Sequence, residues 1–448
     1  MLAHHFTAAG LTSQAISYWQ KAGQRALARF ANLEAIAHIS KGLELLATTP
    51  ESPERLQLEL AMQMTQAAPL IATKGYSASE VEQVFTRARE ICQQFGEVPQ
   101  FFPVVWGMWA FSIVRSRLKT AHEHVEQLLS IAQRQQDPDL LLEAHTTAGI
   151  TFYWSGMFHQ ARPHLEKAIS LYDASKHSSH VLIYVTDPGV AAYCNLSLTL
   201  WMSGYPDQGF QASQKALTLA RQLAHPYSLA TALAFAATFH QLRREPQATQ
   251  QIAEEGIALC QEQQFHIWLA NGMMMRGWAL GLLGQEKEGI QQCHQGVALY
   301  QACGAELAKA QYLGLLVELL WGSGQVEEGL RHLDDIIVAA QQRHEDYYEA
   351  ELHRLKGELM RQKEKSKEQN EITEAEAEAC FHQALEIARR QNAKSLELRA
   401  AMSLSRLLQQ QGKTNEALKT LAEIYNWFTE GFDTPDLKAA KQLLEKLT

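Results

Sequence analysis

The strongest constraint on the fold is a repeat of about 40 residues that runs along nearly the whole chain. Within each unit, small and apolar residues spaced i, i+3, i+4, i+7 predict two amphipathic helices joined by a short turn. Equivalent second-helix positions, at intervals of 40, 46 or 48 residues, are Ile39, Phe85, Val125, Leu165, Ser213, Ala253, Cys293, Leu333, Phe381 and Leu421. Such units can bury their faces only against neighbouring units, so the chain is predicted to stack as a solenoid.

The clearest unit spans residues 142–173. Ala148 lies on the apolar face of its first helix, a turn is expected at Ser155-Gly156, and Ala161 and Leu165 lie on the face of the second helix. This pattern of small and large residues resembles the tetratricopeptide repeat (TPR), with a period longer by about six residues. We therefore expect an all-α fold, a right-handed α–α superhelix of about ten TPR-like helix pairs.

Three segments depart from the regular period. Eight additional residues enter between Tyr172 and Gly189, and a mixed-charge stretch at 361–378 is expected to form a solvated, mobile excursion between two helices. Residues 431–448 are expected to form a C-terminal capping helix that begins at Pro435. The predicted solenoid therefore covers residues 51–430.

Composition excludes several classes of function. The formal charge of −9 argues against a nucleic-acid partner, and no apolar run is long enough to span a membrane. The six cysteines show no CxxC spacing, and the start lacks a signal peptide, so a cytoplasmic location is expected. Gly412-Lys413-Thr414 lacks the rest of a phosphate loop. We expect no catalytic residues, no metal site and no cofactor.

A more specific resemblance rests on residues 4–26, 187–210 and 425–447, which read HHFTAAGLTSQAISYWQKAGQRA, DPGVAAYCNLSLTLWMSGYPDQGF and YNWFTEGFDTPDLKAAKQLLEKL. These stretches resemble the C-terminal TPR region of bacterial multidomain signalling proteins. Those proteins fuse a class III adenylyl/guanylyl cyclase or a kinase to a STAND/AAA+ ATPase and then to TPR repeats. The resemblance implies that residues 1–50, including the first helix pair, are the junction after a missing ATPase domain.

TPR stacks imply that the first helix of each pair lines the concave side. The corresponding positions predict a partner-binding groove formed by Trp106, Tyr153, Trp154, Trp201, Met202, Met274, Trp278 and Trp321. Asn271, Gln311, Glu318, Glu351 and Arg399 fall on the same inner face. An apolar or aromatic-rich partner is expected if the rings are exposed. The alternative is that the longer helices bury these rings in inter-repeat packing.

The predicted function is a non-catalytic sensor region of a signalling ATPase or nucleotidyl cyclase. Its partner would be a protein or peptide, including the protein's own missing domains, or a small inducer. One alternative is a free-standing TPR scaffold that bridges protein partners. A more remote alternative is the inducer-binding solenoid of a transcription activator.

Overall fold

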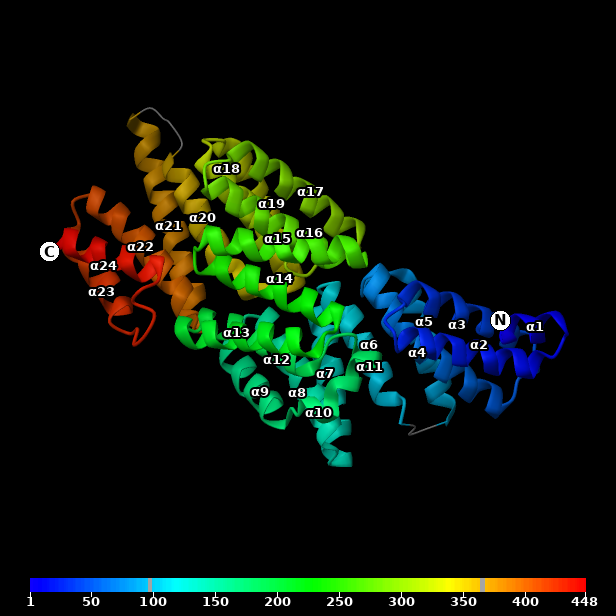
Figure 1. Cartoon of the computed structure of the whole chain (residues 1–448). Coiled ribbons are helices and arrows are strands. Elements are labelled where there is room, and N and C mark those ends of the chain that lie inside the picture. The colour runs from blue at the N-terminus through cyan, green and yellow to red at the C-terminus, as the bar shows by residue number, and fades with distance from the viewer. Residues whose placement is uncertain (96–98, 363–366) are drawn as a thin grey trace.

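The computed structural model describes residues 1–95, 99–362 and 367–448, and side chains outside 96–98 and 363–373. Every regular element in these ranges is a helix (Figure 1). Ten successive pairs stack along the chain, as the repeat predicts, and helices α1 and α24 flank them at the two ends. The prediction of an all-α superhelix is therefore confirmed.

The paired helices have the following bounds. They are α2 (Thr12–Leu27) with α3 (Asn32–Ala47), α4 (Pro53–Lys74) with α5 (Ser79–Phe95), α6 (Phe101–Val114) with α7 (Leu118–Gln135), α8 (Pro138–Trp154) with α9 (Phe158–Leu171), α12 (Pro188–Met202) with α13 (Pro206–Leu223), α14 (Pro226–Leu242) with α15 (Pro246–Gln263), α16 (His266–Leu282) with α17 (Glu286–Ala302), α18 (Lys309–Gly322) with α19 (Val326–Arg343), α20 (Glu349–Gln362) with α21 (Lys367–Gln391), and α22 (Lys394–Gln410) with α23 (Thr414–Tyr425). The remaining elements are α1 (Leu2–Ala8), α10 (Ala174–His177), η1 (Ser178–His180), α11 (Val181–Tyr184), η2 (Asp346–Tyr348) and α24 (Pro435–Leu447).

The prediction of a solvated excursion at 361–378 is wrong for residues 367–378. Residues 367–378 belong to α21, whose 25 residues run as one helix to Gln391. Residues 363–366 lie outside the described residues. The run of Glu and Ala in this stretch favours helix because these residues lose little conformational freedom in it. The insertion after Tyr172 also takes up regular structure, since it forms α10, η1 and α11.

The superhelix closes on itself, so that repeats far apart in the sequence are in contact. The backbone N–H groups of Glu306 and Leu307 donate to the carbonyl of Val114, over 2.9 and 3.0 Å. Farther along, Glu430 Oε1 accepts from the backbone N–H groups of Asp207 and Gln208, at 2.9 and 3.0 Å. These contacts join the turn after α6 to the segment before α18, and the start of α13 to the segment before α24.

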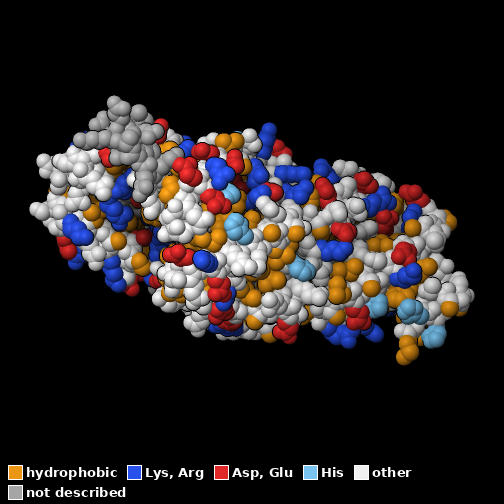
Figure 2. All heavy atoms as spheres, turned by 90° about the horizontal axis from the view of Figure 1, so that it is seen from above, with side chains coloured by type: hydrophobic (Ala, Val, Ile, Leu, Met, Phe, Trp, Pro, Cys, Tyr) orange, Lys and Arg blue, Asp and Glu red, His pale blue; other side chains and the backbone are white. Residues whose placement is uncertain are grey.

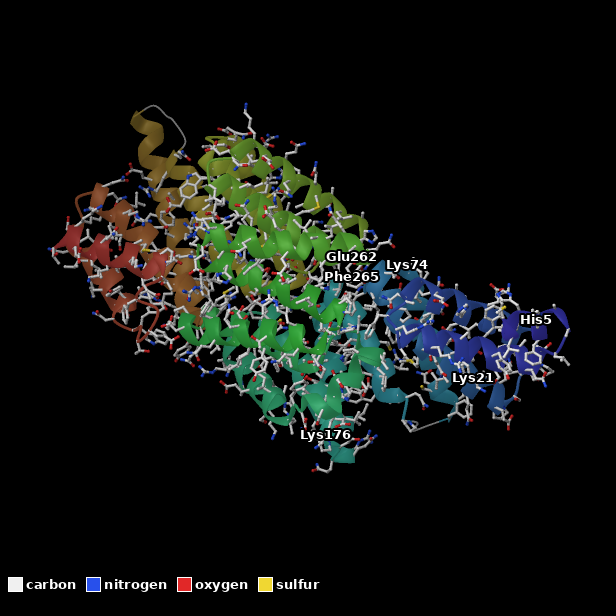
Figure 3. All side chains as sticks on the ribbon, in the orientation of Figure 1. His5, Lys21, Lys74, Lys176, Glu262 and Phe265 are labelled. Carbon is white, nitrogen blue, oxygen red and sulfur yellow. The ribbon has the colours of Figure 1, made fainter. Side chains whose placement is uncertain are left out.

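The N-terminal helices extend to one side of the body formed by α6–α19 (Figure 1). The end of α4 docks against the turn between α15 and α16, where Phe265 is buried with Ala68 and Ile71 in one cluster. Figure 3 shows Lys74 close to Phe265 and Glu262 at this junction. At the other end, α24 buries Leu437 and Leu443 against α22 and α23.

Acidic and basic side chains are interspersed over the face shown in Figure 2. None of the described helices is both long enough and apolar enough to cross a bilayer.

Candidate functional site: a cavity inside the superhelix

The first helices of repeats three to eight enclose a cavity of about 150 Å³. Its walls come from α6, α8, α12, α14, α16 and α18, with Tyr184 and Thr186 of the insertion and the segment before α18 at the sides. The inference that first helices line the inner side of the solenoid therefore agrees with the structure. The segment around Val114 and Leu307 that closes the superhelix also forms part of the cavity wall.

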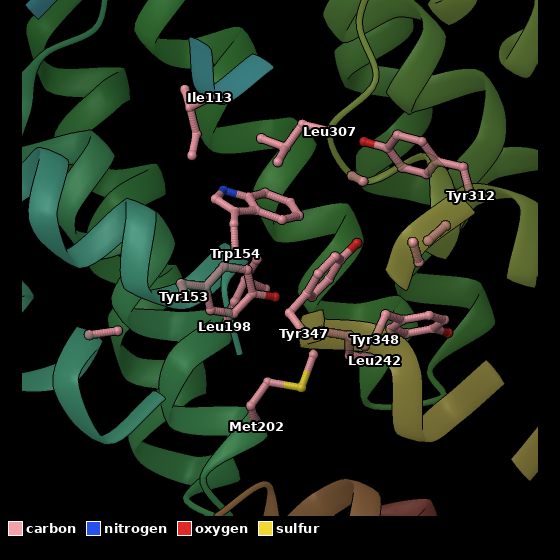
Figure 4. Packing of buried hydrophobic residues seen from close by; sticks show 14 of the residues in the cluster. Ile113, Tyr153, Trp154, Leu198, Met202, Leu242, Leu307, Tyr312, Tyr347 and Tyr348 are labelled. Carbon is pink, nitrogen blue, oxygen red and sulfur yellow. The ribbon is translucent and has the colours of Figure 1, made fainter. Parts of the chain in front are cut away.

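Most of the wall is apolar and aromatic. Figure 4 shows Trp154 of α8 pointing toward Ile113 of α6 and Leu307, so that three distant parts of the chain converge on one ring. The Trp154 ring makes an edge contact with Tyr347, at 4.7 Å between centroids. On another wall, the Trp106 and Tyr184 rings lie 5.0 Å apart. These side chains give the cavity a largely dry, apolar surface.

The polar part of the wall is built mainly of threonines and asparagines. Thr146 and Thr231 donate their hydroxyl protons to the carbonyls of Leu142 and Tyr227, four residues earlier, at 2.8 and 2.9 Å. Thr147 and Thr238 also donate to carbonyls of their own helices. Because the hydroxyl proton of such a threonine is already donated to the helix, its oxygen can only accept a further hydrogen bond. These four threonines, out of the five that line the cavity, therefore offer only acceptors to a ligand.

The two asparagines on the wall each have an oxygen that lacks a partner. Asn195 and Asn271 are 3% exposed, and within the described part of the chain the Oδ1 atom of each makes no hydrogen bond. Their amide nitrogens are satisfied, since Asn195 Nδ2 donates to Ala191 O and Asn271 Nδ2 donates to Tyr312 Oη at 3.0 Å. A buried amide oxygen without a donor costs about 1–3 kcal/mol, so both are free to accept a bond from a ligand.

One acidic residue, Glu143, contributes to the wall and ties the insertion to α8. His180 Nδ1 lies 2.8 Å from Glu143 Oε1, and both side chains are largely buried. Burial raises the pKa of Glu143, and the bond from His180 opposes this shift. Burial lowers the pKa of His180, but the bond and charge of Glu143 outweigh this and leave it raised. The pair therefore holds the insertion against the cavity.

A second buried acid secures the closure. Glu345 is 1% exposed, and its Oε2 accepts a 2.9 Å hydrogen bond from Ser116 Oγ across 229 residues of sequence. Burial raises the pKa of Glu345 to about 7, with Ser116 acting in the opposite direction. Ser77 Oγ and Arg115 donate to the carbonyls of Cys303 and Gly304 at the same junction. The superhelix is thus closed by polar contacts between repeats that are distant in sequence.

The structure separates the predicted groove residues into two groups. Trp106 and Trp154 line the cavity and are 7% and 8% exposed. The rings of Trp201 and Trp278 are buried elsewhere between helices, as are the side chains of Tyr153, Met202 and Met274. Trp321 is half-buried and does not line the cavity. These side chains therefore do not form an open groove of exposed rings, because other helices of the closed superhelix cover them.

Trp201 shows why the open groove does not form. The guanidinium of Arg399 lies 4.8 Å from the centre of its ring, and the backbone carbonyl of Trp201 accepts a bond from Ser395. Both partners belong to the tenth repeat, so the last repeats cover the fifth. The sequence places Trp201 and Arg399 correctly on inner faces, but not in contact with each other.

One pattern in the sequence marks the cavity wall, although the prediction of the groove did not rest on it. Glu143, Ala191, Thr231, Asn271 and Gln311 occupy one equivalent repeat position, and all five line the cavity. A predominantly polar series on an otherwise apolar first helix indicates an inner wall that needs hydrogen-bonding groups. The described residues contain no group of three or more His, Cys, Asp or Glu side chains placed to hold a metal ion.

Comparison with known proteins supports the fold. No family model matches the chain. An uncharacterized protein of Rhizobium meliloti (strain 1021) is 23% identical over 410 residues, which are 91% of this chain and 39% of that protein. The chain therefore spans about two fifths of the length of this relative.

Among solved structures, a Rap protein complexed with Competence and Sporulation Factor superposes with a TM-score of 0.61 at 12% identity, over 85% of this chain and 99% of that one. The APC/C hetero-tetramer Cut9–Hcn1 gives a TM-score of 0.48 at 11% identity, over 100% of this chain and 88% of that one. The fold of this chain is a TPR-like α–α superhelical solenoid.

Proposed function

We propose that this chain is the non-catalytic sensor region of a larger signalling protein, in which occupancy of the internal cavity controls an attached ATPase or nucleotidyl cyclase. The observation that carries the proposal is that a contact closing the superhelix also forms part of the cavity wall. Leu307 lines the cavity, and its N–H bonds Val114 O across the junction. A ligand that favours one arrangement of this junction shifts the position of the repeats on either side.

The comparisons support a longer protein. The Rhizobium relative is longer than the matched region, which is 39% of its length. The resemblance of residues 187–210 and 425–447 to cyclase- and ATPase-linked TPR regions points to the same setting. The Rap protein, which superposes on this chain, is complexed with Competence and Sporulation Factor, so a bound factor is compatible with this fold. The protein's own catalytic domains are the partner that this proposal favours.

The first test is genetic. The coding frame upstream of Met1 should continue into a phosphate-loop ATPase, and a stop codon in that frame would instead support the free-standing scaffold. In the extended protein, replacing Ser77, Arg115 and Ser116 by Ala should weaken the closure and change the basal nucleotide turnover several-fold. A matched triple replacement by Ala at the exposed positions Gln251, Gln261 and Glu286 should not. Unchanged turnover in the closure variant would contradict the proposal.

The second test concerns catalysis by this chain alone. We propose that the purified chain neither hydrolyses ATP nor forms cyclic nucleotides. The assay measures phosphate release and cyclic nucleotide formation by the purified chain. Turnover that disappears in Lys413→Ala would show that the turn at Gly412 binds nucleotide, and the non-catalytic proposal would fail.

A further inference from the structure

The cavity wall has a definite charge preference. Its lining includes no lysine or arginine among the described residues, and Glu143 is its one acidic side chain. An anionic ligand would lose its hydration without meeting an opposite charge, which is costly in an apolar enclosure. The wall therefore disfavours carboxylates and phosphates.

The hydrogen-bonding groups of the wall point to the same class of ligand. The four threonine hydroxyls have given their protons to helix carbonyls, and Asn195 Oδ1 and Asn271 Oδ1 are buried acceptors without a partner. Glu143 uses Oε1 for His180, and no described residue bonds its Oε2 atom. The wall also holds one buried donor without a partner among the described residues, the indole Nε1 of Trp268. A ligand that satisfies the two asparagine oxygens and Glu143 must bring hydrogen-bond donors.

Aromatic rings accompany the acid in the wall. His180, which bonds Glu143, lies 5.5 Å from the Tyr184 ring, and Tyr184 lies 5.0 Å from Trp106. Glu143 and these two aromatic rings line the same cavity. A cavity that combines one acid with aromatic rings favours an organic cation, because ring quadrupoles and a carboxylate both attract positive charge.

The volume limits the size of the ligand. A cavity of about 150 Å³ with an apolar wall is comparable in size to engineered protein cavities that take up benzene. A molecule with one aromatic ring and a short side chain is of the size that this volume holds.

We propose that the cavity binds a compact aromatic amine, with its ring beside Trp106 and Trp154 and its ammonium group donating to Glu143 Oε2. The remaining donors of the ligand face the acceptors on Asn195 and Asn271. This assignment names the class of ligand for the sensor proposed above. Its regulatory role rests on that proposed function. The binding site itself can be tested on the chain alone.

The test is a matched series of three probes added to the purified full chain: phenethylamine, 2-phenylethanol and phenylacetate. They share one ring and differ in carrying a cation, a neutral hydroxyl or an anion. Calorimetry and tryptophan fluorescence should show saturable one-to-one binding that is tightest for phenethylamine, at least tenfold weaker for 2-phenylethanol and undetectable for phenylacetate. Equal binding of phenylacetate, or no binding of any probe to the folded chain, would overturn the proposal.

Two variants locate the binding in the cavity. Glu143→Gln keeps an acceptor for His180 but removes the charge, so phenethylamine affinity should fall at least tenfold and 2-phenylethanol affinity should change less than twofold. Ala191→Leu fills the cavity and should abolish binding of both probes. Glu288→Gln, on the exposed side of α17, is the control and should leave both affinities unchanged. Unchanged amine affinity in folded Glu143→Gln would contradict the role of Glu143.

The two proposals can fail separately. Probe binding is measured without any catalytic domain, so its failure removes the ligand assignment and leaves the regulatory proposal to the turnover assay. If the probes bind as expected but closure variants leave turnover unchanged, the ligand site stands and the regulatory proposal fails.

Discussion

The indole N–H of Trp278 donates a 3.0 Å hydrogen bond to Glu318 Oε2, from the equivalent position of the next repeat, 40 residues away. The other oxygen of Glu318 pairs with Arg244. Arg244 has φ 64° at a turn position that is glycine in the neighbouring repeats, as at Gly204 and Gly284. A non-glycine residue in this conformation is strained, and its buried ion pair with Glu318 offsets that strain.

Removing this N–H should destabilise the fold. Trp278→Phe keeps an aromatic ring but leaves Glu318 with one donor fewer, so we expect a loss of about 1.5–3 kcal/mol in the free energy of unfolding. Urea denaturation measures this loss in the free energy of unfolding. Trp427→Phe, at a ring that is 37% exposed, should change stability by less than about 0.5 kcal/mol. Similar losses in both variants would argue against the bond to Glu318.

Close helix packing within the seventh repeat depends on glycine. A Cβ atom at Gly289 would lie 2.5 Å from Gly277 O and 2.7 Å from Gly281 N, both of which are backbone atoms. Gly289→Ala should therefore cost about 1–3 kcal/mol, because the two helices of this pair must move apart. Gly322→Ala is the control, since no atom lies within 4 Å of the added Cβ. It should be neutral or slightly stabilising in thermal unfolding.

Glu345 should make the stability of the chain depend on pH. Its pKa is raised to about 7 by burial, so between pH 4.5 and 7 the folded state holds a proton that the unfolded state has lost. The stabilisation is complete below pH 4.5 and is lost as the pH rises through 7, by up to about 3 kcal/mol.

Glu345→Gln removes this titration. Urea denaturation at pH 5, 6, 7 and 8 should show a smaller decline for the variant than for the natural chain, and the variant should be the more stable at pH 8. Glu286→Gln, at an exposed position of α17, should follow the natural chain. Parallel curves for the natural chain and Glu345→Gln would refute the assignment.

Two arginines of the inner face should respond differently to the same substitution. Arg354 bonds both oxygens of buried Glu351, at 2.9 and 2.7 Å. Burial alone would raise the pKa of Glu351, but the charges of Arg354 and Arg399 hold it at about 2. Arg354→Met leaves this carboxylate poorly paired and should cost about 3–5 kcal/mol.

Arg406→Met is the matched comparison. Arg406 makes no ion pair within the described side chains, and burial together with the nearby charges of Arg354 and Arg361 lowers its pKa. The substitution should be neutral or stabilising in chemical denaturation. A loss of stability as large as that of Arg354→Met would show that the Arg406 guanidinium has a partner that stabilises the fold.

The sequence alone determined the repeat, the helix pairs and their turns. The turn at Ser155-Gly156 lies between paired helices as predicted, and α24 begins at Pro435 as predicted. These features depend on interactions within one unit and its immediate neighbours, which a 40-residue period records directly. For the same reason, the sequence placed Trp106 and Trp154 on the inner side.

Only the tertiary structure decided what the inner side encloses. The closure depends on contacts such as Ser116–Glu345, which join residues 229 positions apart. Those contacts arise from small rotations between successive repeats that add up over five or six units, and no single period specifies their sum. This accumulated rotation buries Trp201 beneath Arg399 and holds the insertion with His180 against Glu143. It places an internal cavity where an open groove was expected.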